Sequence, residues 1–160
     1  MKKKAFFYET SIIGTVGIAE KDGAITNVFF GKTVVPKEYQ QEETPLLKKA
    51  ASQLDEYLSG KRTEFDLPLQ PEGTVFEQSC WKALQTIPYG ETRTYGQQAK
   101  LLDNPKASRA VGRANGQNPI SIFIPCHRVI GANGSLTGFA GGIEVKKQLL
   151  ELERSIIGEE

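Results

Sequence analysis

The chain has few of the residues that build metal centres and disulfide frameworks. Its 160 residues include two cysteines and one histidine. Cys80 and Cys126 form no C-x-x-C pair, so a four-ligand zinc site lacks ligands and no metal is predicted. Behind the basic start MKKK, Tyr8 and Glu9 break the apolar run at once, which is untypical of a secretory signal. We therefore expect a reducing, intracellular setting, in which a Cys80–Cys126 disulfide is disfavoured.

Long apolar runs are also missing. None approaches the ~20 residues that cross a bilayer, so no membrane partner is expected. The hydrophobic share of 39% and the charged share of 24% are ordinary for a soluble globular protein, which we expect in the cytoplasm. A chain of this length forms one large domain or two small ones.

The net charge of +1 conceals an uneven distribution of charge. Residues 80–147 carry 9 Lys and Arg against 3 acids, whereas residues 1–79 carry 10 against 12. A positive segment suits a polyanion such as nucleic acid. A solvated basic face would give the same counts, so charge alone leaves both interpretations open.

Patterns in the first part of the chain predict strands followed by a helix. Two apolar runs flank Lys21-Asp22-Gly23, which indicates a hairpin. Thr44 can cap a helix, Pro45 suits its first turn, and Gly60 ends it.

The predicted boundary between two domains follows this helix. Pro68, Pro71 and Gly73 interrupt the apolar pattern there. The predicted domains are residues 1–72 and 73–160.

The second part of the chain is predicted to be mainly helical. Thr74 with Glu77, and later Thr94 with Gln97, have the spacing of capping boxes that begin helices. Cys80 falls on the apolar face of the first of these helices. Because free cysteine is often buried, Cys80 is predicted to be a small core residue.

A further helix is predicted to begin at Asn104 and Pro105 and to end at Gly116. It follows the short helix after Thr94 closely. Two short helices joined by a tight turn indicate a helix-turn-helix.

A basic stripe marks this last helix. Lys106, Arg109 and Arg113 are spaced i, i+3 and i+7, and their neighbours, among them Ala110 and Ala114, are small. A slim basic second helix is typical of a DNA-reading element. The alternative is a surface helix that packs through its alanines, and the uneven charge favours nucleic acid.

Apolar residues lead to the second cysteine. Ile120, Ile122 and Ile124 predict a buried extended segment, and Pro125 then removes a backbone donor from any strand ladder. We therefore expect the chain to turn at Cys126 and to present the thiol.

Cys126 has the neighbours of a nucleophile. A free thiol has a pKa near 8.5, so it needs a nearby base or positive charge, which His127 and Arg128 could supply. Glu153, on the apolar face of a C-terminal helix, could orient the imidazole. From residues alone, Cys126 is equally compatible with an inert buried thiol, and Glu153 with a half-exposed surface residue.

The segment Pro125-Cys126-His127-Arg128-Val129 resembles the active-site signature of the methylated-DNA–protein-cysteine methyltransferases, which repair 6-O-methylguanine in DNA. The segments QLDEYLSGKRTEFDLPL, IPYGETRTYGQQA, NPKASRAVG and NPISIFIPCHRVIG follow the order and spacing of the family over nearly the whole chain. The resemblance implies an α/β, ribonuclease-H-like N-terminal domain. It also implies a mainly α-helical, winged-helix-like C-terminal domain with a helix-turn-helix.

The resemblance also implies roles for individual residues. Cys126 would accept the alkyl group, and His127 would act as base through a bound water with Glu153 behind it. Asn118 would brace the turn that carries the cysteine. Tyr95 would lie near the purine ring and ease the build-up of charge on the departing base.

The DNA contacts are implied in the same way. Arg109 would enter the base stack and fill the gap left by the extruded nucleotide. The helix from Lys106 through Ala114, which includes Ala110 and Arg113, would bind the minor groove.

Two positions depart from the family pattern. This chain has Phe139 and Ala140 where many members carry Tyr and Ser. With Val129, these residues would line the substrate pocket, and Ala140 would still offer its backbone N–H to the base oxygen. The preference among alkyl groups is left open.

The implied function is single-use transfer of the alkyl group from 6-O-methylguanine, and from 4-O-methylthymine, in duplex DNA to Cys126. The base is flipped out first. No cofactor is required, and a monomer is expected. One alternative is a non-catalytic lesion sensor of the same fold, but such relatives replace the cysteine. Another alternative is a thiol hydrolase. Two features argue against it: Cys126 and His127 are adjacent, and no Gly-rich loop precedes Cys126.

Overall fold

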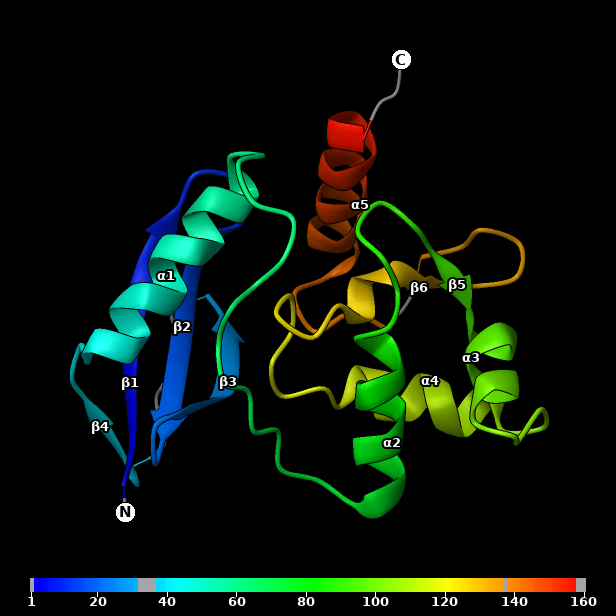
Figure 1. Cartoon of the computed structure of the whole chain (residues 1–160), viewed down its shortest axis with the longest axis horizontal. Helices are drawn as coiled ribbons and strands as arrows, with labels where there is room; N and C mark the ends of the chain where they lie inside the picture. The colour runs from blue at the N-terminus through cyan, green and yellow to red at the C-terminus, as the bar shows by residue number, and fades with distance from the viewer. Residues whose placement is uncertain (1, 32–36, 137, 158–160) are drawn as a thin grey trace. The chain divides into compact units, whose positions relative to one another are not determined.

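A computed structural model describes residues 2–31, 37–136 and 138–157. The chain divides into two compact units, Met1–Pro71 and Glu72–Glu160 (Figure 1). Within the described residues, no helix is both long and apolar enough to cross a membrane.

A four-stranded sheet forms the N-terminal unit. The strand order is β3-β2-β1-β4; β4 runs parallel to β1, and the other neighbours are antiparallel. The β2–β3 hairpin is confirmed, and its turn contains Asp22 and Gly23 at φ 53° and 80°, as a two-residue turn with left-handed backbone requires. The strands are β1 (Lys3–Thr10), β2 (Gly14–Lys21), β3 (Ala24–Phe30) and β4 (Tyr39–Gln41).

Helix α1 (Pro45–Leu58) lies against this sheet (Figure 1). Its predicted start is confirmed, since the Thr44 hydroxyl accepts a hydrogen bond from the Leu47 N–H at 3.1 Å. Gly60 follows the helix with a φ of 78°, the left-handed conformation that commonly ends helices. The side chains that α1 buries are Leu47, Ala50, Gln53, Leu54, Tyr57 and Leu58.

The C-terminal unit is mainly helical. Its two short strands, β5 and β6, pair in parallel, with Thr94 opposite Ile130. In chain order its elements are α2 (Val75–Leu84), β5 (Arg93–Thr94), α3 (Tyr95–Leu101), α4 (Ser108–Gly116), the 3-10 turn η1 (Cys126–Arg128), β6 (Val129–Ile130) and α5 (Ile143–Ile157).

Both predicted capping boxes are confirmed. The Thr74 and Thr94 hydroxyls accept from the N–H groups of Glu77 and Gln97, and the side chains of Glu77 and Gln97 accept from the Thr N–H groups. Cys80 is fully buried in α2, as predicted. These contacts span three residues, so local sequence suffices to specify them.

The predicted start of α4 is wrong. The helix begins at Ser108, and Ala107 occupies the capping position without a side-chain hydrogen bond. The Asn104 N–H donates to the Ala99 carbonyl, and the Asn104 carbonyl accepts from Ala107, each at 3.0 Å. Asn104 is therefore used to end α3 and to close a turn, so Lys106 lies before the helix and not on it.

The extended segment predicted at Ile120, Ile122 and Ile124 is also wrong. These side chains are buried, but the Ile124 N–H donates to the Ile120 carbonyl at 2.9 Å and the chain turns. Ile122, at the turn, has a φ of 76°. That value is rare for a β-branched residue.

Buried polar contacts hold α2, α3 and α4 together. The side-chain amides of Gln98 and Asn115 form two reciprocal hydrogen bonds, of 3.2 and 2.8 Å. Gln98 also donates to the Cys80 carbonyl, and the Trp81 indole donates to the Ala114 carbonyl at 2.8 Å. Because all of these groups are buried, their pairing favours one arrangement of the three helices.

Candidate active site around Cys126

Cys126 is the first residue of η1, directly after Pro125. The predicted turn is confirmed, and the Cys126 N–H donates to the Ile124 carbonyl at 2.8 Å. The thiol is not presented to solvent, however, because Cys126 is only 5% exposed. The site is therefore a buried thiol at a sharp change of chain direction.

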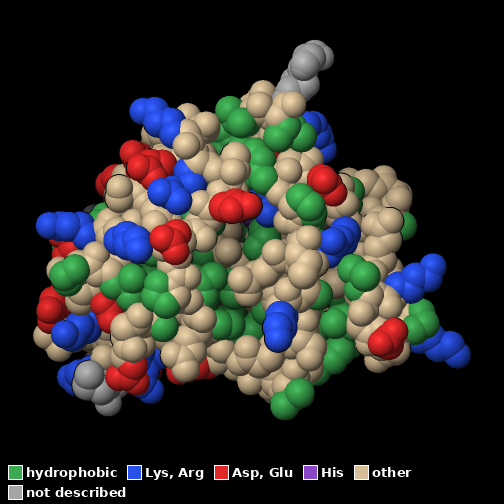
Figure 2. Space-filling model, in the orientation of Figure 1, with side chains coloured by type: hydrophobic (Ala, Val, Ile, Leu, Met, Phe, Trp, Pro, Cys, Tyr) green, Lys and Arg blue, Asp and Glu red, His purple; other side chains and the backbone are tan. Residues whose placement is uncertain are grey.

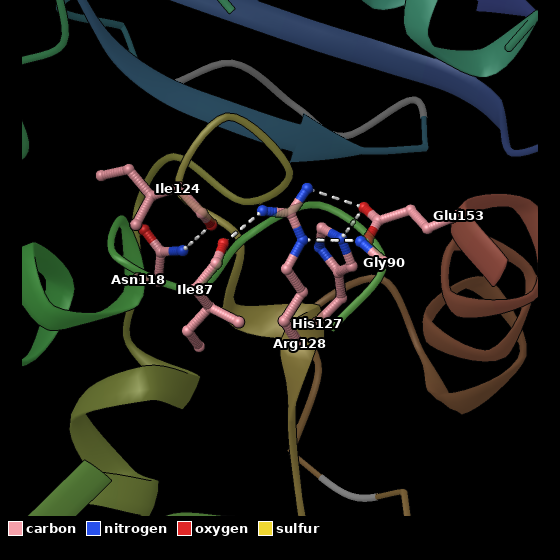
Figure 3. Close-up of polar contacts among 7 residues, drawn as sticks. All are labelled: Ile87, Gly90, Asn118, Ile124, His127, Arg128 and Glu153. Carbon is pink, nitrogen blue, oxygen red and sulfur yellow. Dashed lines mark hydrogen bonds and ion pairs between the residues drawn. The ribbon is translucent and has the colours of Figure 1, made fainter. Parts of the chain in front are cut away.

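Asn118 connects the two ends of the loop before the cysteine. Its Nδ2 donates to the Ile124 carbonyl at 2.9 Å (Figure 3), and its Oδ1 accepts from the Ile120 N–H at 3.0 Å. One buried amide thus satisfies two backbone groups that the turn leaves without strand partners.

Glu153 of α5 lies behind the cysteine turn, at 1% exposure. Its Oε2 is 2.8 Å from Nε2 of His127 (Figure 3). The Arg128 guanidinium donates to both carboxylate oxygens at 2.9 Å, and the Gly90 N–H donates to Oε1 at 3.1 Å. One carboxylate therefore joins α5, η1 and the segment before β5.

These contacts keep the buried carboxylate ionised. Burial alone would raise the pKa of Glu153, but the hydrogen bonds and charges of His127 and Arg128 outweigh it and lower the pKa to about 2. Arg128 is itself buried and donates to the Ile87 carbonyl at 2.8 Å (Figure 3). Its forked pairing with Glu153 is the geometry that guanidinium and carboxylate groups favour.

His127 is fully buried, and burial lowers its pKa, although Glu153 opposes the shift. The imidazole is therefore neutral at neutral pH. Because an ionised carboxylate only accepts hydrogen bonds, the ring hydrogen lies on Nε2 and Nδ1 is the basic nitrogen. The ring of Phe139 lies at 90° to the imidazole, with 6.5 Å between centroids.

Burial also raises the pKa of the Cys126 thiol, while hydrogen bonds from Asn118 and Ser121 and the charge of Lys146 lower it. Sequence reasoning did not identify Ser121 or Lys146. Lys146 is 1% exposed on α5, with Nζ 6.0 Å from the ring centroid of Tyr95. Lys146 precedes Glu153 by seven residues, or two helical turns, and this spacing could have predicted that both lie on the same face of the helix.

The predicted DNA-contact residues separate into exposed and inner positions. Arg109 and Arg113 are exposed on α4, and Lys106 is exposed in the turn before it. Ala110 is half-buried, whereas Ala114 is buried and its carbonyl accepts from Trp81. Ala114 therefore belongs to the inner side of the helix. In Figure 2, Lys and Arg side chains project at the right-hand edge, and no histidine surface is visible.

The remaining predicted site residues lie at different depths. Tyr95, the first residue of α3, is half-buried, and its ring is 3.6 Å from the position that a Cβ on Gly112 would take. Val129 and Phe139 are buried, whereas Ala140 is exposed. Across the described ranges, no group of three or more His, Cys, Asp or Glu side chains is arranged to hold a metal ion.

The chain matches two family models that together cover most of its length. Residues 75–155 match the 6-O-methylguanine DNA methyltransferase DNA binding domain, and residues 4–71 match the ribonuclease-like domain of the same proteins. The methylated-DNA–protein-cysteine methyltransferase of Methanosarcina acetivorans is 50% identical over 149 residues, covering 91% of this chain and 95% of that protein. The Mycobacterium tuberculosis protein of the same name is 50% identical over 147 residues, covering 91% and 89%.

Solved structures agree with these matches. The crystal structure of Mycobacterium tuberculosis OGT in complex with DNA has a TM-score of 0.88 and 46% identity, covering 96% of this chain and 94% of that one. The fold and site thus define a two-domain protein with an N-terminal sheet unit and a helical unit that carries a buried cysteine. The chain belongs to the methylated-DNA–protein-cysteine methyltransferase family.

Proposed function

We propose that this protein repairs alkylated DNA by transferring the alkyl group of 6-O-methylguanine, and of 4-O-methylthymine, in duplex DNA to Cys126. The observation that carries the proposal is the buried Cys126 thiol followed in η1 by His127, whose Nε2 lies 2.8 Å from the buried Glu153 carboxylate. The names of the most similar relatives and the DNA complex of one of them support it.

The reaction is a displacement at a saturated carbon. Nδ1 of His127 takes the thiol proton through a water, and Glu153 stabilises the imidazolium that forms. The Cys126 thiolate attacks the alkyl carbon, so that an S–C bond forms while the bond from that carbon to the base oxygen breaks. The electron pair of the broken bond stays with guanine, which takes up a proton from water while Tyr95 hydrogen-bonds the ring, and the His127 imidazolium returns its proton to water.

The product is an S-alkyl-cysteine. A thioether is not hydrolysed by an imidazole or a carboxylate, so each molecule acts once. The protein itself is the second substrate, and the displacement needs no redox partner or cofactor.

The DNA is engaged through the helix-turn-helix of α3 and α4. A target carbon inside a duplex is out of reach, so the nucleotide must be flipped out, at a cost of a few kcal/mol. Arg109 fills the gap, and Lys106 and Arg113 contact phosphates while Ala110 lets α4 approach the minor groove closely. Because Ala114 lies on the inner side of α4, it supports the helix and does not touch DNA.

The pocket for the flipped base is lined by Val129, Phe139 and Ala140. Phe139 supplies an apolar wall against the imidazole. The exposed Ala140 offers its backbone N–H to the base oxygen.

The proposal also covers the fold type of each domain, the oligomeric state and the place where the protein acts. The strand order β3-β2-β1-β4, with β4 parallel to β1, supports a ribonuclease-H-like N-terminal domain. The helix-turn-helix of α3 and α4 lies in the chain between the paired strands β5 and β6, which supports a winged-helix-like C-terminal domain. We propose a monomer that acts inside the cell on chromosomal DNA.

The decisive experiment is peptide mass spectrometry after incubation with duplex DNA that contains 6-O-methylguanine. The expected result is a gain of one methylene on the Cys126 peptide and none on the Cys80 peptide, with one methyl transferred per protein molecule. Cys126→Ser should bind the DNA without gaining mass. An unmodified Cys126 in wild-type protein that binds the methylated DNA tightly would favour the lesion-sensor alternative.

A further inference from the structure

The Ser121 hydroxyl lies beside the cysteine and has no part in the mechanism above. Its Oγ is 4.0 Å from Sγ of Cys126, within reach of a hydrogen bond to sulfur. Ser121 is 2% exposed, so water does not compete freely for either group.

The loop before the cysteine holds Ser121 in this place. Ser121 pairs with Ile124 in an isolated bridge, and Asn118 connects the two ends of the loop. The next residue, Ile122, has a φ of 76°. A strained backbone of this kind persists only where the surrounding contacts determine it, and such positions cluster at active sites.

We propose that the Ser121 hydroxyl donates a hydrogen bond to the Cys126 thiolate and is a further catalytic residue for the alkyl transfer, an inference that rests on the proposed function. A hydroxyl is both donor and acceptor. While the sulfur is protonated, the S–H donates to Oγ; once His127 has taken that proton, the O–H rotates and donates to sulfur. Ser121 keeps its own proton throughout, so the proton balance of the reaction is unchanged.

Other charged and titratable groups also act on the sulfur. Burial raises the pKa of Cys126, and the hydrogen bonds of Asn118 and Ser121 and the charge of Lys146, which lies on α5, oppose that shift. Tyr95 of α3 lies near Lys146, and His127 is the next residue in the chain, with Glu153 and Arg128 behind it. None of these groups is removed when Ser121 is changed, so a Ser121 variant isolates the contribution of the hydroxyl.

The first test is a titration of the two cysteines by NMR, with ¹³C at Cβ, in the absence of DNA. In Ser121→Ala the Cys126 midpoint should move to higher pH. At a fixed pH below the midpoint, the thiolate population should fall about threefold to tenfold, the effect of one such hydrogen bond. Ser121→Thr, which keeps the hydroxyl, should titrate as the parent does. Cys80, whose pKa burial raises to about 11, is the internal reference.

The second readout is the rate of methyl transfer from DNA as a function of pH. S121A should be slower by the same factor below its midpoint and should approach the parent rate above it, because only the thiolate population changes. Ser79→Ala, an exposed serine of α2, is the matched control and should behave as the parent.

The proposal is overturned if folded S121A titrates as the parent does, or if S121T titrates as S121A does. If S121A does not fold, Ser121→Thr and Ser121→Val provide the same comparison, because the two side chains have similar volumes and only threonine carries a hydroxyl. A protein that does not accept methyl groups from DNA would overturn the proposed function. The titration would still decide the role of Ser121, since it needs no DNA.

Discussion

At the scale of single residues, Glu153 organises the site. Its carboxylate is within hydrogen-bond distance of His127, of two nitrogens of Arg128 and of the Gly90 N–H. A buried charge is tolerated only when it is paired in this way, and removing one partner leaves the others uncompensated. The same side chain therefore serves both the stability of the unit and the orientation of the imidazole.

Glu153→Gln should lower both stability and activity. Because it leaves Arg128 buried without its counter-ion, the free energy of unfolding at pH 7 should fall by about 3 kcal/mol. The folded-state pKa of Glu153, about 2, lies below that of an unfolded carboxyl. The stabilisation is therefore present above about pH 4.3 and is lost as the pH falls towards 2.

Urea denaturation of both proteins at several pH values measures this difference. The difference in the free energy of unfolding between wild type and E153Q should become steadily smaller as the pH falls below 5. Glu151→Gln, an exposed neighbour on α5, is the control and should change stability little at any pH. A gap that is constant between pH 7 and pH 2 would contradict the role of the ionised carboxylate.

At the scale of elements, the position of α4 depends on buried polar contacts rather than on its own capping. The helix begins without a side-chain cap. The reciprocal amide pair of Gln98 and Asn115, with the Trp81 bond to the Ala114 carbonyl, attaches α4 to α2 and α3. The exposed arginines of α4 are therefore positioned by residues on its inner side.

Asn115→Ala should test this attachment. The buried Oε1 of Gln98 would lose the Asn115 amide as its donor, at a cost of about 1–3 kcal/mol in the free energy of unfolding. Affinity for duplex DNA should fall as α4 loosens, while reaction with a free 6-O-alkylguanine base should change little. Gln117→Ala, exposed just after α4, is the control for denaturation and DNA titration. Unchanged stability in N115A would show that the amide pair does not hold the helix.

Arg109→Ala should affect only the reaction in duplex DNA. The variant lacks the side chain that fills the space left in the base stack by the flipped nucleotide. Flipping then costs more free energy, so repair of duplex DNA should be about tenfold slower. Reaction with the free alkylated base should be spared. Single-turnover rates with both substrates measure the split, and Arg154→Ala, exposed on α5, is the control. An equal loss in both rates would mean that Arg109 acts on the chemistry.

At the scale of the whole molecule, charge and chemistry are concentrated in the C-terminal unit. The stretch from 80 to 147 carries 9 Lys and Arg against 3 acids and contains α3, α4 and Cys126. The sheet of the N-terminal unit contributes none of the catalytic residues proposed above. The uneven charge indicates which unit approaches the phosphate backbone.

DNA affinity should therefore fall as salt rises. Each phosphate contact releases condensed counterions, so the logarithm of the binding constant should decrease linearly with the logarithm of salt concentration. Arg113→Ala should reduce that slope by about one. Fluorescence anisotropy at several salt concentrations measures the slope, and Arg62→Ala in the N-terminal unit is the control. Binding that does not respond to salt would exclude phosphate contacts as the source of affinity.

The sequence by itself determined the features that depend on near neighbours. The capping boxes at Thr74 and Thr94, the hairpin at Asp22 and the turn at Cys126 each arise from contacts within a few residues, so composition and spacing specify them. The family followed from motifs that are continuous in the chain and was confirmed by the comparisons.

Only the tertiary structure decided what depends on distant segments. The fork between Arg128 and Glu153 joins residues 25 apart in sequence, and the amide pair of Gln98 and Asn115 joins residues 17 apart. The hydroxyl of Ser121 reaches the sulfur over a shorter span, but only because the buried Asn118 amide folds the loop back, which no periodicity predicts. Such contacts close long loops or satisfy buried polar groups, and they form only when the whole unit is packed.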